Sequence, residues 1–90
     1  MAQVRAGVDA LDRELARLIG RRFRHMDAAA RIKADRAAVR DEDRKAAVLA
    51  NARANAAAAG WSPDLAAALW DTLVEASIAY KLEAFDGRGD

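Results

Sequence analysis

One apolar stripe dominates the first third of the sequence and limits the folds that are open to it. The apolar residues recur at steps of four and three: Val4, Val8, Leu11, Leu15, Leu18, Met26 and Ala29. This spacing is typical of one face of an α-helix, which has 3.6 residues per turn. Gly7 and Gly20 interrupt the stretch, but a single glycine costs a helix only about 1 kcal/mol. We therefore expect one helix over about residues 4–34, roughly 45 Å long.

A helix of this length is too long for a compact domain of 90 residues, whose radius of gyration would be about 12 Å. We expect it to extend beyond its own domain and to be covered by a second chain. Composition points the same way, because hydrophobic residues make up 53% but 25 of the 90 residues are alanine. A small core with so few bulky side chains leaves a monomer marginally stable. The sequence therefore predicts a homodimer.

A second helix is predicted after a break in the helical period at residues 34–40, which we interpret as a connecting loop. The loop is followed by three acidic residues whose acceptors and negative charge suit the free N–H groups of a helix start: Asp41, Glu42 and Asp43. We place this helix at about 41–59. Gly60 is expected to end it, because glycine readily adopts the left-handed conformation that follows many helices.

A third helix is predicted over about residues 62–85. Ser62 is a good N-cap and Pro63 suits the first helical position. Its apolar stripe again follows the helical period: Leu65, Leu69, Leu73 and Ala76. Strand-like alternation is absent from the sequence, so we expect an all-α protein with one domain over residues 1–90 and three helices, the first very long.

Charge and cysteine content exclude several classes of function. Fifteen basic and 14 acidic residues give a net charge of +1, so nucleic acid and anionic membrane are not expected as partners. The absence of cysteine excludes disulfides and thiolate metal sites. No apolar run approaches the roughly 20 residues of a membrane span, and the N-terminus has no secretory signal core. A cytoplasmic protein is the expectation.

Two cations occupy positions on the apolar stripe itself. Arg22 and Lys33 stand where apolar residues are expected, three turns and about 16 Å apart on one face. A single cation there would keep its head group in solvent. Two cations on one stripe favour burial, which requires compensating charge, and the acidic residues are predicted to lie mostly on outward faces.

Further polar residues fall near these two cations. Arg44 and Lys45 lie in the first turns of the second helix, and Ser77 and Lys81 share a face of the third at i, i+4. Arg5 lies at the far end of the first helix, where a second copy would reach. The set predicts a cationic pocket inside a helical bundle. A small dicarboxylate is the expected ligand, because arginine binds carboxylates with two parallel hydrogen bonds.

Four segments, in order, carry a resemblance to a known family: "VRAGVDALDRELARLIGRR", "AARIKA", "VRDEDR" and "VEASIAYK". From about Val4 to Phe85 the chain resembles the AroQ-class chorismate mutases and their relatives, the isochorismate pyruvate lyases. The resemblance implies an all-helical, intertwined homodimer with shared active sites, and no cofactor or metal.

The resemblance also implies roles for individual residues. Arg5 would cross the dimer to bind a substrate carboxylate in the partner's pocket, and Arg22 would hold the other carboxylate. Lys33 would bond a carboxylate and the ether oxygen of the breaking C–O bond. Three more residues would line the substrate pocket, near the ring hydroxyl and the carboxylates: Asp41, Arg44 and Ser77.

Two positions depart from the family pattern. Lys45 stands where the mutases commonly have a glutamate, a change that is compatible with the lyases. Lys81 stands where glutamine or glutamate is common, which is unusual in either branch. The mutase reaction is unimolecular, so it needs a folded substrate and positive charge at the ether oxygen. Lys81 can supply that charge, and the predicted catalytic residues are Arg22, Lys33 and Lys81.

Three functions remain open from the sequence. The first is the rearrangement of chorismate to prephenate on the route to phenylalanine and tyrosine. The second is cleavage of isochorismate to salicylate and pyruvate by the same fold. The third is a non-catalytic helical dimer module, in which the cations serve only in salt bridges.

Overall fold

The computed structural model describes the backbone of residues 1–32 and 39–88 and the side chains of residues 1–28, 39–84 and 86. Within these residues the protein has three helices and no strand: α1 (Ala2–Ile32), α2 (Glu42–Ala59) and α3 (Pro63–Arg88). The predicted all-α class with a long first helix is therefore confirmed. None of the described helices has a stretch apolar and long enough to span a membrane.

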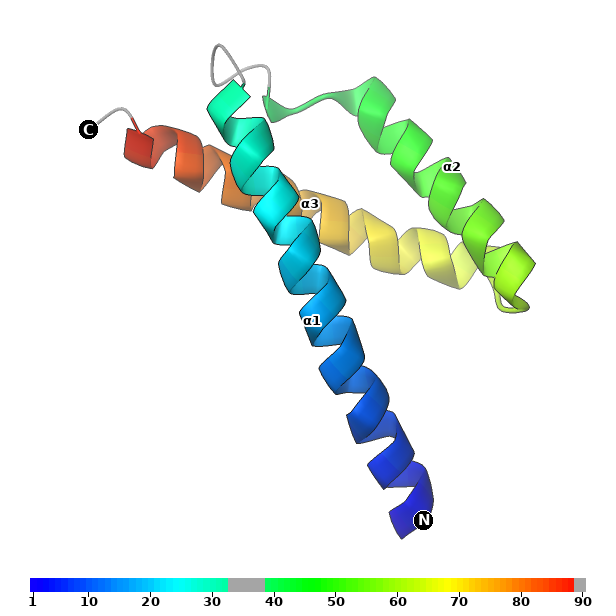
Figure 1. Cartoon of the computed structure of the whole chain (residues 1–90). Coiled ribbons are helices and arrows are strands. Elements are labelled where there is room, and N and C mark those ends of the chain that lie inside the picture. The colour runs from blue at the N-terminus through cyan, green and yellow to red at the C-terminus, as the bar shows by residue number, and fades with distance from the viewer. Residues whose placement is uncertain (33–38, 89–90) are drawn as a thin grey trace.

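The first helix determines the shape of the molecule. Helices α1 and α2 both pack against α3, and α1 crosses α3 with its upper part while its N-terminal half projects away (Figure 1). The radius of gyration is 15.6 Å and the longest dimension 50 Å, against about 12 Å for the radius of a compact chain of this length. Along the projecting half, Val4 and Leu11 are 61% and 64% exposed. The apolar stripe is thus uncovered on the single chain.

Local capping residues explain why α2 and α3 form a tight helical hairpin. Gly60 follows α2 with φ of 85°, in the left-handed region, and its N–H donates to the carbonyl of Ala57 at 3.2 Å. Glycine adopts this conformation without steric cost, which is why it ends so many helices. Ser62 then caps α3, because its Oγ accepts the N–H of Leu65 at 3.1 Å. These caps agree with the sequence-based expectations.

Small side chains let α2 and α3 approach closely near the hairpin turn. Ala52 and Ala56 of α2 and Ala66 of α3 are buried together, with Trp70 packed against them. A second cluster lies at the opposite end of the two helices, where Val39 is only 1% exposed and packs with Val74 and Ile78. The chain segment that enters α2 is therefore anchored on α3 by apolar burial.

The upper part of α1 is held to α3 by polar and aromatic contacts. The hydroxyl of Tyr80 donates to Oδ1 of Asp27 at 2.7 Å, and this bond is the main reason that the pKa of Tyr80 is raised. The rings of Phe23 and Tyr80 meet edge to face, with centroids 5.0 Å apart. These contacts fix the rotation of α1 about its axis, and so decide which of its side chains face α3.

The third helix is longer than predicted. It continues through Gly87 to Arg88, although the sequence indicated an end near Phe85. A single glycine lowers helix stability by only about 1 kcal/mol, so Gly87 does not by itself stop a helix that is otherwise well supported.

Candidate functional site

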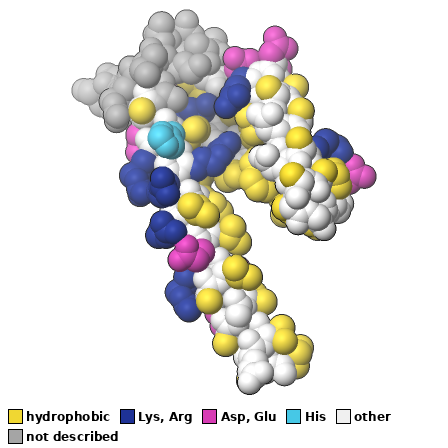
Figure 2. Space-filling model, turned by 45° about the vertical axis from the view of Figure 1, so that its right-hand side comes forward, with side chains coloured by type: hydrophobic (Ala, Val, Ile, Leu, Met, Phe, Trp, Pro, Cys, Tyr) yellow, Lys and Arg dark blue, Asp and Glu magenta, His cyan; other side chains and the backbone are white. Residues whose placement is uncertain are grey.

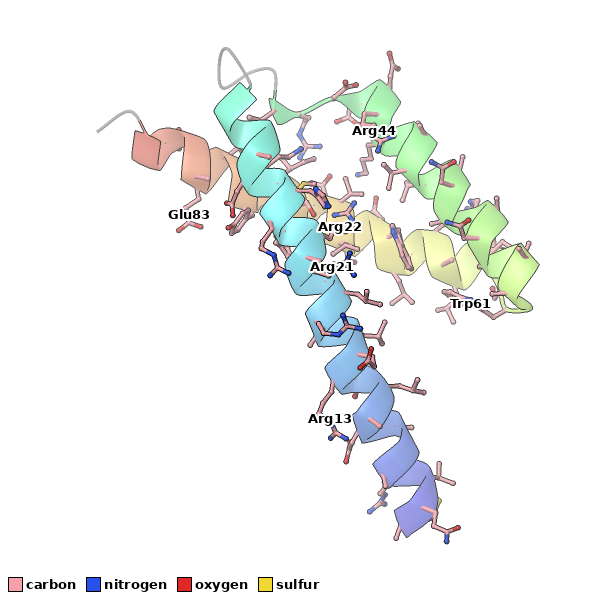
Figure 3. All side chains as sticks on the ribbon, viewed as in Figure 1. Arg13, Arg21, Arg22, Arg44, Trp61 and Glu83 are labelled. Atoms are coloured by element: carbon pink, nitrogen blue, oxygen red, sulfur yellow. The ribbon has the colours of Figure 1, made fainter. Side chains whose placement is uncertain are left out.

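A cavity of about 90 Å³ lies where the three helices meet. Its polar lining combines one residue of α1, three from the start of α2 and two of α3: Arg22, Asp41, Arg44, Lys45, Ser77 and Lys81. Arg22 and Arg44 project from α1 and α2 into the space above α3 (Figure 3). The structure thus brings together six of the eight residues that the sequence singled out.

The rest of the lining is apolar and was not predicted from the sequence. It consists of Met26, Val39, Val48, Val74 and Ile78. Val74 and Ile78 lie at i, i+4 on α3 beside Ser77, so the helical period offered a signal for two of them. Val39 offered none, because it lies in a segment interpreted as a loop. An apolar wall around a few charged groups is typical of small-molecule sites.

Arg22 is oriented by a hydrogen bond across the helix interface. Its Nη1 donates to Oγ of Ser77 at 2.7 Å, and that hydroxyl donates in turn to the carbonyl of Leu73 at 2.7 Å. Ser77 is 3% exposed, so the pair is shielded from water. The relay fixes one edge of the guanidinium, and within the described part of the chain no other acceptor binds its remaining N–H groups.

Within the described residues, the guanidinium groups of Arg22 and Arg44 form no ion pair, although the carboxylate of Asp41 also lines the cavity. The pKa of Arg22 is lowered, first by burial of the guanidinium and then by the positive charge of Arg44. Arginine remains protonated despite such a shift. The folded protein therefore carries the free energy cost of a buried positive charge beside another one. An anion bound between the two guanidinium groups would offset that cost, because it places a negative charge beside each of them.

Asp41 has a structural task in addition to its place in the lining. It is the N-cap of α2, with φ of −131° and ψ of 100°, and its Oδ1 accepts the N–H of Arg44 at 2.9 Å. The cap satisfies a free N–H group at the helix start. It also fixes the backbone from which the side chain of Arg44 enters the cavity.

Lys45 is neutralised by two carboxylates of α3. Its Nζ donates to Oε2 of Glu75 at 2.8 Å and lies 2.9 Å from Oδ1 of Asp71. Glu75 is the first cause of the raised pKa of Lys45, followed by Asp71. Both carboxylates remain partly exposed, with 51% of the Asp71 side chain and 41% of the Glu75 side chain accessible. Lys45 therefore borders the cavity with its charge already compensated.

Two predicted residues are not part of the described cavity. Arg5 is exposed and lies 17 residues before Arg22 on the same helix, which corresponds to about 25 Å along the axis. No side chain reaches that far, so Arg5 cannot enter the cavity of its own chain. Lys33 lies outside the described residues.

The family model for chorismate mutase type II matches residues 4–82. The chain belongs to this family. The match includes all the residues that line the cavity, and a search of curated proteins found no match. Membership of the chorismate mutase type II family supports an activity of the chorismate mutase type, on a small-molecule substrate.

Proposed function

We propose that the protein catalyses the rearrangement of chorismate to prephenate, a cytoplasmic step towards phenylalanine and tyrosine. One observation carries the proposal. In a chain of this family, Arg22 is held by buried Ser77 and faces Arg44 across a cavity, and within the described residues neither guanidinium has the negative charge of a paired carboxylate. A dicarboxylate of small size supplies that charge, because each carboxylate can accept two parallel hydrogen bonds from a guanidinium.

Positioning accounts for most of the proposed catalysis. Chorismate has two carboxylates, and holding both in place selects the folded conformer in which the new C–C bond can form. Arg22 and Arg44 are the carboxylate ligands that this chain brings to the cavity. The reaction breaks one C–O bond and forms one C–C bond within a single molecule, so no acid, base or nucleophile is consumed.

Electrostatic stabilisation supplies the second contribution. Negative charge develops on the ether oxygen as the C–O bond breaks, and a cationic donor placed there lowers the barrier. Lys81 lines the cavity one turn beyond Ser77 and is our candidate donor. Lys33 is proposed as a second donor, from the resemblance in sequence.

A homodimer is part of the proposal. Leu15, Leu18 and Leu69 line an apolar groove of about 460 Å³ between α1 and α3, and Arg22 borders both this groove and the polar cavity. Hydrophobic side chains follow one side of the projecting half of α1 (Figure 2). A second copy in the groove would bury the stripe and could bring its own Arg5 to the cavity. It would also enlarge a site that is small beside the roughly 300–1,000 Å³ of typical ligand sites.

The lyase reaction on isochorismate is the alternative. The observation that favours it is the pairing of Lys45 with Glu75 and Asp71. At this position the mutases commonly have a glutamate that binds the substrate hydroxyl, whereas here the position holds Lys45 and offers no carboxylate. The position of the hydroxyl is what distinguishes isochorismate from chorismate.

The test is an assay of purified protein with each compound in separate reactions. Loss of chorismate with formation of prephenate and without pyruvate would establish the proposed function. Pyruvate and salicylate from isochorismate would replace it by the lyase reaction. No turnover of either compound, together with no direct binding of an oxabicyclic dicarboxylate transition-state analogue, would refute both and leave a helical module without catalysis. Arg22→Ala is the control for a contaminating activity.

A further inference from the structure

Glu75 of α3 connects two cations that lie on either side of the start of α2. Its carboxylate is bound by both guanidinium nitrogens of Arg40, at 2.7 Å from Nη2 to Oε1 and 3.1 Å from Nη1 to Oε2. The same Oε2 accepts a hydrogen bond from Nζ of Lys45 at 2.8 Å. A bidentate contact of this kind fixes the orientation of the guanidinium relative to the carboxylate as well as the distance between them.

The two cations enclose the turn that carries Arg44. Arg40 immediately precedes the N-cap Asp41, and Lys45 immediately follows Arg44. Arg40 also donates to Oε1 of Glu42 at 3.0 Å. A carboxylate on α3 that holds residues 40 and 45 therefore holds the whole first turn of α2, including the residue whose guanidinium enters the cavity.

This turn needs such support because electrostatic repulsion acts on it. Arg44 lies close enough to Arg22 for its positive charge to lower the pKa of Arg22. Among the described residues, none accepts a hydrogen bond from the guanidinium of Arg44. Helix α2 packs on α3 rather than mainly on α1, so repulsion in the cavity would push the start of α2 away from the other two helices.

We propose that Glu75 is a positioning residue, which holds the start of α2 against α3 and so keeps Arg44 in place before the substrate arrives. Glu75 is not part of the cavity lining, so the role that we propose for it acts through α2 rather than by contact with the substrate. The effect of Glu75 on catalysis rests on the proposed function. Its structural role, which is to hold the start of α2, does not depend on that function. Burial of Val39 anchors the same segment by apolar contact, which does not fix its orientation. The hydrogen bonds of Glu75 fix that orientation.

The charge of Glu75 persists across the working range of pH. Its hydrogen bonds from Arg40, and then from Lys45, lower its pKa to about 2. The bridge is therefore fully formed near neutral pH, where the cations of the cavity are also charged.

The kinetic test compares Glu75→Gln with Asp71→Asn. Both changes remove one carboxylate from Lys45 at nearly constant shape, but only the first also releases Arg40. Substrate binding would have to draw the loosened turn back into place, which weakens binding more than it slows the chemical step. For Glu75→Gln we expect KM for chorismate to rise about tenfold with kcat within about twofold. For Asp71→Asn we expect both constants within about twofold. Equal effects of the two variants would overturn the proposal.

A second readout needs no turnover. Hydrogen exchange at the amides of residues 41–45 should be faster in Glu75→Gln than in the wild-type protein or in Asp71→Asn, with the amides of the hairpin turn unchanged. Arg40→Gln, which leaves the bond between Glu75 and Lys45 in place, should produce part of this acceleration, and the double variant should add nothing to the effect of Glu75→Gln. Unchanged exchange would refute the positioning role. Faster exchange in a protein that does not convert chorismate would uphold the role and refute only the proposed function.

Discussion

The two halves of α1 carry the same helical stripe but meet different surroundings. In the N-terminal half the stripe is apolar and exposed, with Leu15 at 52% and Leu18 at 47%. In the upper half it reaches Arg22, and the helix there is fixed to α3 by hydrogen bonds and an aromatic contact. Periodicity alone thus predicts a helix and a face. The types of residue on that face indicate what covers it. We propose that a second copy of the chain covers the N-terminal half and that a ligand covers the C-terminal half.

The largest expected effect is on dimerisation, when a charge is introduced into the apolar stripe of the N-terminal half of α1. Leu15→Asp places a charge in the proposed dimer interface twice, once from each copy. Loss of two buried leucines, at about 1.5–3 kcal/mol each, should weaken dimerisation by roughly 10²–10⁴-fold. Sedimentation equilibrium measures the change, and activity should fall with dilution in parallel.

The matched control for this variant is Ala10→Asp. It introduces the same charge on the same half of α1, at an exposed position about 140° away round the helix. We expect it to leave the dimer intact. If both variants dissociate the protein equally, the stripe does not define the interface.

The next largest effect concerns the polar half. Arg22→Ala removes the guanidinium that joins α1 to Ser77 and faces Arg44. Removal of a donor from a shielded site typically costs 10²–10³-fold in rate, so kcat/KM for chorismate should fall by roughly that factor while the dimer persists. Arg24→Ala, exposed on the opposite side of α1, is the control and should change kcat/KM by less than about twofold. Similar losses in both would contradict the assignment.

A smaller effect is expected when Arg22 is kept but loses its orientation. Ser77→Ala removes the buried hydroxyl that accepts its hydrogen bond. Hydrogen bonds to charged groups contribute about 1.5 kcal/mol or more, which corresponds to about a tenfold fall in kcat/KM. Steady-state kinetics on the variant measures this. Ser77→Thr keeps the hydroxyl, and recovery of most of the activity would identify orientation as the cause.

The smallest effect is the pH dependence of stability that Glu75 contributes. Its pKa is lowered from 4.5 to about 2, so its ion pairs favour the folded state above pH 4.5. This contribution is lost as the pH falls towards 2. The difference in melting temperature between wild type and Glu75→Gln should be constant above about pH 5 and shrink below it. A difference that grows on acidification would contradict the bridge.

Local chemistry made most of the fold predictable. The caps at Asp41, Gly60 and Ser62 depend on single residues and their near neighbours, so the sequence reveals them directly. The stripe of α1 likewise requires only a period. The predicted end of the third helix, near Phe85, is about three residues too early, because a single glycine such as Gly87 does not stop a helix that is supported on both sides.

The site was predictable only in part. Cations on an apolar stripe stand out, and the resemblance named their companions, which the structure gathers round one cavity. The partners of Lys45 did not stand out, because Asp71 and Glu75 lie 26 and 30 residues away in sequence and belong to another helix. Their pairing depends on how α2 and α3 cross, which no local pattern encodes. The roles of the lining residues stay predictions.

The tight turn at Gly60 also bears on the order in which the molecule assembles. Helices α2 and α3 are neighbours in sequence and in space, so their contacts close a short loop at small entropic cost and form early. The contacts of Arg22 with Ser77 and of Asp27 with Tyr80 span 55 and 53 residues. We expect them to follow. In the dimer that we propose, the exposed half of α1 would gain its contacts last, at a rate set by protein concentration. Dilution should therefore slow the final phase of refolding and leave the first untouched.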